Sequence, residues 1–189
     1  IMGPCAGGAV YSPAITDFVI MVDKTAHMFI TGPEVIKTVT NEVVSFEDLG
    51  GAMTHASKSG VSHFTAESDD AAIQLARDLC DMFPSNNMDR APVRKTSDSP
   101  DRICDALDNM IPEDTNKPYD VTDVVREVLD DGGFLEVQAD YAMNIVCGFG
   151  HLAGHTVGVV ANQPKVLAGC LDIDASDKAC LLYTSDAAD

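Results

Sequence analysis

The chain has 189 residues, 46% of them hydrophobic, and its 30 acidic and 12 basic residues give a formal net charge of −18. This hydrophobic fraction is large enough for a buried core and is higher than that of intrinsically disordered chains. The scarcity of Lys and Arg argues against nucleic acid as a partner, and no apolar run approaches the roughly 20 residues of a membrane span. The six cysteines include no CxxC pair, which predicts reduced core thiols in a cytoplasmic protein rather than a disulfide framework.

Short strands and helices alternate in the first part of the chain. Residues 17–22 and 26–30 are short apolar runs that predict buried strands. Pro33 and Ser45 mark the starts of two helices. Ser68 caps a further helix, whose apolar residues recur at helical spacing until a proline ends it. This alternation indicates an α/β layer structure.

The composition changes over residues 84–118. Five of the nine prolines lie there among Asp, Ser and Asn, which predicts an interdomain linker with one short turn at 103–110. Asp120 then caps another helix. Two apolar runs, 144–152 and 156–161, are joined by Ala-Gly-His and predict a hairpin. A second α/β unit therefore follows the linker.

The most informative motif is the pair Gly7-Gly8, within the sequence GPCAGGAVYSP of residues 3–13. Glycine lets the backbone come close to a ligand. Amides at the start of a helix have no partner inside it and carry the positive end of its dipole. Such amides suit an oxyanion, for example the enolate oxygen of a thioester. The alternative is a tight turn with nothing bound.

Histidine-based sites have weaker support in the sequence. His151 and His155 are four residues apart, but the helix and the third ligand of a zinc site are missing, so no metal site is expected. His55 and His63 flank the polar residues 57–60, which suggests a serine nucleophile with a histidine base. No G-x-S-x-G pattern supports that arrangement, and we expect a polar loop instead.

Acidic pairs complete the candidates. Asp69 with Asp70, and Asp130 with Asp131, are expected to be helix-end and surface charges rather than a catalytic dyad. The P-loop and dinucleotide-binding fingerprints are both absent. By elimination, the amides of the paired glycines are the best chemical candidate.

Several segments, in order along the chain, resemble the carboxyltransferase (β) subunit of biotin-dependent acyl-CoA carboxylases, of the propionyl-CoA carboxylase type. They include GPCAGGAVYSP (3–13), FITGPEVIKTVT (29–40), GVVANQP (158–164) and GCLDI (169–173). The resemblance covers residues 1–179.

The resemblance implies a crotonase-like α/β fold made of β-β-α repeats, with parts of two such domains. Residues 1–83 would be the C-terminal half of the first carboxyltransferase domain. Residues 84–118 would be the interdomain linker, and 119–179 the start of the second domain. Residues 180–189 resemble an in-frame translation of a sequencing adapter, so we expect an artefact there and a chain cut at both ends.

The resemblance also implies a reaction and its residues. Carboxybiotin would give CO2 to the α carbon of a short acyl-CoA, turning propionyl-CoA into methylmalonyl-CoA. The amides of Gly7 and Gly8 would form the oxyanion hole for the acyl-CoA carbonyl. A second hole, for the biotin carbonyl, would lie beyond residue 179. No metal is implied in this chain.

The implied partners are acyl-CoA, an α subunit with biotin carboxylase and the biotin carrier, and further β subunits. The β subunits of this family form dimers within a hexamer, and their active sites lie between the two chains of a dimer. Membrane insertion is not implied.

Three alternatives stay open. Methylmalonyl-CoA or glutaconyl-CoA decarboxylase subunits run the same chemistry backwards, with a sodium-pumping membrane partner. A simple crotonase-type hydratase or isomerase uses carboxylates near the acyl chain, and no such pair lies near Gly7-Gly8 in the sequence. The third alternative is an inert, truncated fragment that aggregates through its exposed sheet edges.

Overall fold

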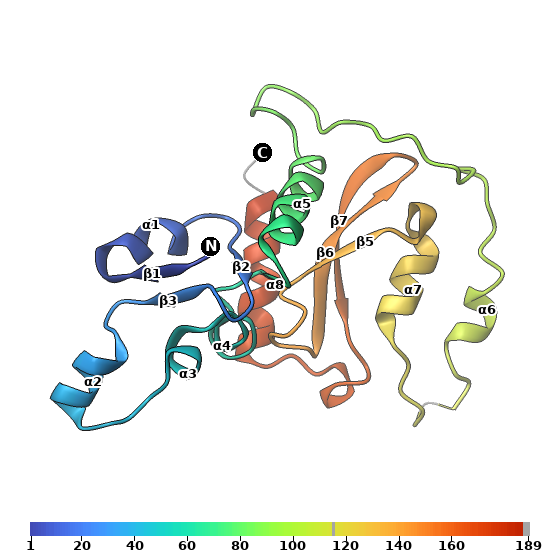
Figure 1. Cartoon of the computed structure of the whole chain (residues 1–189). Helices are drawn as coiled ribbons and strands as arrows, with labels where there is room; N and C mark the ends of the chain where they lie inside the picture. Colours follow the sequence, from blue (N-terminus) through green and yellow to red (C-terminus); the bar gives the residue numbers. More distant parts are fainter. Residues whose placement is uncertain (115, 187–189) are drawn as a thin grey trace. The chain divides into compact units, whose positions relative to one another are not determined.

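The computed structural model describes residues 1–114 and 116–186, with side chains through residue 180 (Figure 1). The chain divides into two compact units, Ile1–Asp78 and Leu79–Asp189. In the described part of the chain, no helix combines the length and the apolar character that a membrane crossing requires.

Four short strands of the first unit form two parallel pairs. Strand β1 (Pro4–Ala6) pairs with β3 (His27–Phe29), and β2 (Ile20–Val22) pairs with β4 (Phe64–Ala66). The two predicted strands correspond to β2 and β3 and are confirmed, although both are shorter than the apolar runs in the sequence.

Three helices of this part begin where the sequence predicts: α2 (Pro33–Thr40), α3 (Phe46–Gly50) and α5 (Asp69–Cys80). The sequence did not predict α4 (Ala52–Thr54) or the π-helical turn η2 (His55–Ser59). The Ser45 hydroxyl accepts from the Asp48 amide at 3.0 Å, and the Ser68 hydroxyl accepts from the Ala71 amide at 3.2 Å. Both serines therefore satisfy amides that the first turn of a helix leaves without a partner.

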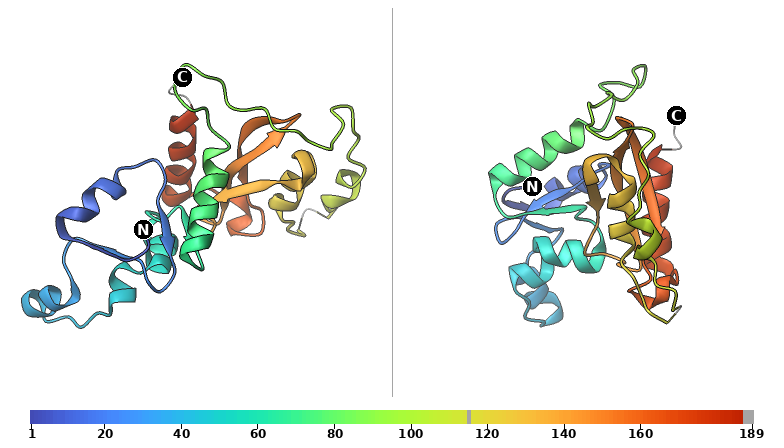
Figure 2. Two further views of the ribbon diagram at one scale, coloured as in Figure 1. Left: turned by 45° about the horizontal axis from the view of Figure 1, so that its top comes forward. Right: turned by 90° about the vertical axis from the view of Figure 1, so that its right-hand side faces the viewer.

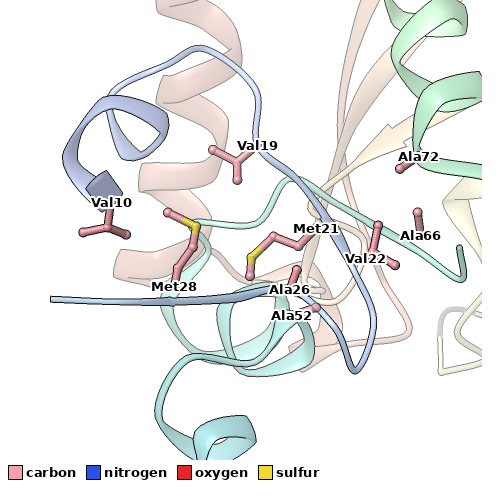
Figure 3. Close-up of a cluster of buried hydrophobic side chains, with 9 residues drawn as sticks. All are labelled: Val10, Val19, Met21, Val22, Ala26, Met28, Ala52, Ala66 and Ala72. Carbon is pink, nitrogen blue, oxygen red and sulfur yellow. The ribbon is translucent and has the colours of Figure 1, made fainter. Parts of the chain in front are cut away.

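A compact apolar cluster anchors the first unit (Figure 3). Its members come from strands, helices and turns: Val10, Val19, Met21, Val22, Ala26, Met28, Ala52, Ala66 and Ala72. Val10 lies at one end of the cluster and belongs to the turn that follows β1. Burying a valine side chain contributes about 1.5–3 kcal/mol, so the core holds this turn in place.

The second unit contains an antiparallel sheet in the order β5 (Phe134–Val137), β6 (Ile145–Leu152) and β7 (His155–Asn162). The predicted hairpin is confirmed as β6 and β7. Figures 1 and 2 show α7 (Val121–Val128) and α8 (Ile173–Asp186) on opposite faces of this sheet. This cover explains why every residue of β6 except the last is buried.

Lys178 of α8 is a buried cation in this unit. Its ammonium donates to the carbonyl oxygens of Gln138, Tyr141 and Ile145 at 2.8, 2.8 and 2.9 Å. Burial lowers the pKa of Lys178. All three donors of the ammonium are used, so the side chain joins α8 to the loop between β5 and β6 and to the first residue of β6.

The predicted linker, residues 84–118, lies within the second unit and forms hydrogen bonds with its hairpin and with α7. The amide of Arg94 donates to the Gly154 carbonyl at 2.8 Å, in the turn of the hairpin. The guanidinium of Arg102 donates to two carbonyls at the end of α7, at 2.8 and 3.1 Å. Helix α6 (Leu107–Met110) coincides with the predicted short turn. The role of this stretch as an interdomain linker stays a prediction.

Asp130 corrects the expectation of surface charges. It is buried, and its carboxylate accepts from the amides of Ala153 and Gly154 at 3.0 and 2.6 Å. These two amides replace water around the carboxylate, and Asp130 thereby fixes the hairpin turn. Asp131 is exposed, as expected, and accepts a hydrogen bond from the Ser97 hydroxyl.

Cys5, Cys80, Cys104, Cys147 and Cys170 are thiols without a disulfide, and the six cysteines are not all in the core. Cys147 is buried, and burial raises its pKa to about 11. Cys80, Cys170 and Cys180 are exposed, so the expectation of core thiols is wrong for these three. Of the suspected artefact, residues 187–189 lie outside the described residues, and the assignment of 180–189 stays a prediction.

Candidate functional site

The paired glycines lie at the end of β1, where the chain enters the 3-10 turn η1 (Gly7–Val10) and then α1 (Tyr11–Ala14). Ala6 is extended, with φ −130° and ψ 155°, whereas Gly7 has φ +63°. A left-handed backbone costs an L-residue about 1–2 kcal/mol. The local fold therefore requires glycine at position 7.

Gly8 is different, because the chain's own packing does not require it to be glycine. Its φ lies outside the left-handed range, and a Cβ built on it would meet no atom within 4 Å. The residue is exposed. The space that a side chain at this position would occupy is therefore open.

The amides of these two residues start η1 and have no acceptor inside that turn. The turn is held from both sides. Val10 is buried in the core, and the Cys5 thiol donates to the Ala9 carbonyl at 3.4 Å. Amide dipoles fixed in this way need no reorganisation when negative charge develops on a bound oxygen.

Residues 57–59 belong to the π-helical turn η2, so the prediction of a polar loop at 57–60 is wrong for them. The structure also separates the two histidines that flank this segment, His55 and His63. The His63 Nδ1 accepts from the Val19 amide at 3.1 Å. The His55 Nδ1 lies 2.8 Å from the Ser59 hydroxyl, and its Nε2 lies 2.7 Å from the Met28 carbonyl oxygen. The two imidazoles therefore serve different segments and do not converge on one serine.

The other histidine pair does not form a metal centre. His151 is buried in β6 opposite Thr156, while His155 is exposed at the start of β7 opposite Leu152. Among the residues that the structure describes, no group of three or more His, Cys, Asp or Glu side chains is placed to hold a metal ion.

The family model named carboxyl transferase domain matches residues 1–182. The chain belongs to the carboxyl transferase domain family.

Known members of this family are similar to the chain over nearly its whole length. The carboxyltransferase subunit of propionyl-CoA carboxylase from Haloferax mediterranei is 57% identical over 178 residues, which are 94% of this chain and 34% of that protein. The α subunit of methylmalonyl-CoA decarboxylase from Veillonella parvula is 56% identical over 179 residues, which are 95% of this chain and 35% of that protein.

A solved structure supports the fold. Transcarboxylase 12S, described as a hexamer with methylmalonyl-coenzyme A and methylmalonic acid bound, superposes with a TM-score of 0.92 at 51% identity. The match covers 96% of this chain and 35% of that one. The predicted α/β, crotonase-like fold of the carboxyl transferase family is confirmed, and the chain spans about a third of the length of the relatives it matches.

Sequence reasoning found the glycine turn of this carboxyl transferase segment but missed the bond between His55 and the Met28 carbonyl. The spacing of His55 and Ser59, four residues apart, was a local signal for their contact. Met28 lies 27 positions from His55 in the sequence, and it takes part through its backbone carbonyl. No side-chain pattern marks such a partner.

Proposed function

We propose that this chain is part of a carboxyltransferase subunit that transfers CO2 from carboxybiotin to the α carbon of a short acyl-CoA, with propionyl-CoA as the first candidate. The observation that carries the proposal is the family match over residues 1–182, which includes the open turn at Gly7-Gly8. The amides of these two glycines are the proposed oxyanion hole for the acyl-CoA carbonyl.

The chemistry of this turn follows from where charge develops. When the α proton of the thioester leaves, the carbonyl oxygen takes up negative charge. Amide donors aimed at that oxygen stabilise the enolate more than the ground state, and loss of one such donor typically costs about 10²–10³ in rate. The turn thus acts through its backbone, and it needs no acidic or basic side chain of its own.

Biotin, carried on a partner subunit, would supply the CO2 and the nitrogen that accepts the α proton. By the family resemblance, its carbonyl would lie in a hole beyond residue 179, so we assign it no residue of this chain. We also propose a biotin-carrying α subunit as a partner, β-subunit dimers within a hexamer, and a cytoplasmic location, which the free thiols favour.

A second candidate is the reverse reaction. The decarboxylase subunit from Veillonella parvula is 56% identical to this chain, against 57% for the carboxylase subunit from Haloferax mediterranei. The glycine turn would serve both directions, because both pass through the same enolate. Overall identity does not separate them, and an assay of direction does.

The direction is tested with the full-length subunit assembled with its biotin-carrying partner. Labelled bicarbonate, ATP and propionyl-CoA are supplied, and carboxylated acyl-CoA is measured. We expect label in methylmalonyl-CoA, without a requirement for sodium ions or membranes.

Two results would contradict the carboxylase proposal. One is no incorporation of label by the assembled enzyme. The other is decarboxylation of methylmalonyl-CoA that depends on sodium ions and a membrane partner, which would favour the second candidate. Acetyl-CoA and butyryl-CoA, tested in parallel, measure the preferred chain length.

A further inference from the structure

His55 contacts a carbonyl on the strand next to β1. The His27 amide donates to the Gly3 carbonyl at 3.3 Å, so the backbone groups of His27 face β1. Successive residues of a strand direct their backbone groups to opposite edges, and the Met28 carbonyl therefore faces away from β1. The His55 Nε2 lies 2.7 Å from this oxygen and supplies its hydrogen-bond donor. In a wider sheet, the backbone amide of a neighbouring strand would take that place.

The contacts fix the orientation of the imidazole. A carbonyl oxygen can only accept, so Nε2 must carry the proton and donate to Met28. In the neutral ring, Nδ1 then accepts a hydrogen bond from the Ser59 hydroxyl, whose oxygen lies 2.8 Å away. In the cationic ring, Nδ1 donates and the hydroxyl accepts. The bond to Met28 is present in both protonation states.

Two further contacts join β3 to the segment from α3 to η2. Gly50, the last residue of α3, approaches so closely that an added Cβ would collide with the Met28 carbonyl. The His27 Nε2 lies 2.6 Å from Glu47 Oε1. The segment from α3 to η2 is therefore fixed against β3 on the side opposite β1.

The other side of β3 leads directly to the glycine turn. Met28 lies opposite Cys5, and Phe29 opposite Ala6, the residue before Gly7. We propose that His55 is a positioning residue for the thioester-oxygen site: its bond to the Met28 carbonyl fixes β3, and β3 sets where β1 ends and the Gly7-Gly8 amides begin. This inference rests on the proposed function of the turn.

Two substitutions of His55 separate its two contacts. In His55→Gln, the side-chain amide nitrogen occupies the place of Nε2 and still donates to Met28. In His55→Asn, the shorter side chain reaches Ser59 and no longer reaches Met28. Ser59→Ala removes the hydroxyl and leaves the Met28 bond.

The kinetic test uses the full-length subunit with its biotin-carrying partner. We expect His55→Asn to lower kcat for CO2 transfer by about 10-fold or more, towards the roughly 10²–10³ of a lost donor, with KM for acyl-CoA within about 2-fold. His55→Gln and Ser59→Ala should keep kcat within about 3-fold. Equal losses in Asn and Gln variants, or a larger loss in Gln, would overturn the proposal.

Amide hydrogen exchange gives a readout that does not depend on activity. Peptides covering residues 1–8 and 26–30 should exchange faster in His55→Asn than in His55→Gln, because β3 has lost the hydrogen bond from residue 55 to the Met28 carbonyl. Unchanged exchange in both peptides would also overturn the positioning role. If the wild-type enzyme transfers no CO2, the proposed function fails, whereas the exchange experiment still decides whether His55 fixes β3 and the turn.

Discussion

Gly7 and Gly8 are adjacent, but the structure makes different demands on them. Gly7 has a left-handed backbone, whereas Gly8 does not and has free space around it. We expect Gly7→Ala to lower the free energy of unfolding by about 1–2 kcal/mol, and Gly8→Ala to change it by less than about 0.5 kcal/mol. Urea denaturation of the full-length subunit measures both. Equal losses of unfolding free energy in the two variants would contradict the left-handed backbone conformation of Gly7.

His63 is expected to make the stability of the fold depend on pH. Burial lowers the pKa of His63 from its usual 6.5, against the opposing charge of Asp17. The folded protein therefore keeps the His63 ring neutral, with Nδ1 accepting from the Val19 amide, to a lower pH than the unfolded chain, in which the ring is protonated below pH 6.5. The unfolded state then binds more protons, so stability is full above pH 6.5 and falls as the pH drops below it.

The variant His63→Asn tests this linkage, because it keeps an acceptor near the Nδ1 position and removes the titration. We expect a smaller decrease in unfolding free energy between pH 7.5 and 5.5 than in the wild type. His151, whose pKa is also lowered by burial and by Arg94, should supply the remaining slope. An unchanged slope in His63→Asn would assign the pH dependence to other groups.

At the scale of elements, Lys178 connects α8 to the segment between β5 and β6 through three hydrogen bonds. Lys178→Met would remove the ammonium from three carbonyls, of which that of Gln138 keeps a hydrogen bond from the Tyr141 amide at 3.0 Å. A buried acceptor that loses its donor costs about 1–3 kcal/mol, so we expect the unfolding free energy to fall by more than about 2 kcal/mol.

Lys165→Met is the matched control for this change. Lys165 pairs with Asp120 at 3.0 Å, and its side chain is 53% exposed, so its loss should cost less than about 1 kcal/mol. Thermal or urea denaturation compares the two variants. Similar losses in both would mean that water replaces Lys178 at the three carbonyls.

Elements with local signals were predictable from the sequence. Ser45, Ser68 and Asp120 cap helices through amides two or three residues away, so each signal lies within one turn. The partners of Asp130 and Lys178 lie 23 to 40 positions away in the sequence, and they are backbone groups. Backbone groups carry no residue-specific signal, which is why the burial of these two charges was not foreseen.

The candidate site also has one part with a local sequence signal and one part that depends on distant segments. The turn at Gly7-Gly8 was predictable, because adjacent glycines followed by an apolar helix start are a local pattern. The open space at Gly8 and the contact between His55 and Met28 depend on how strands and helices meet. The proposed substrate rests on the family resemblance and not on the chemistry of any side chain.

At the scale of the whole molecule, exposed apolar side chains oppose a large negative charge. Ile15, Val43, Ile103 and Ile173 are each at least 80% exposed, while the net charge of −18 keeps chains apart. We expect the isolated 189 residues to be inactive and to associate more as salt screens this repulsion. Light scattering between low and high salt tests this. A monodisperse sample that unfolds cooperatively at every salt concentration would contradict it.

The role of the glycine turn is tested most directly by the rate of CO2 transfer in a Gly8→Pro subunit. Proline is tolerated in a first helical turn but has no N–H, so this change removes the proposed donor. Gly3→Ala is the control, since an added Cβ there meets no atom within 4 Å. We predict a fall of about 10²–10³ in rate for Gly8→Pro, and none for Gly3→Ala, in folded enzyme. Undiminished transfer by Gly8→Pro would contradict the proposed oxyanion site.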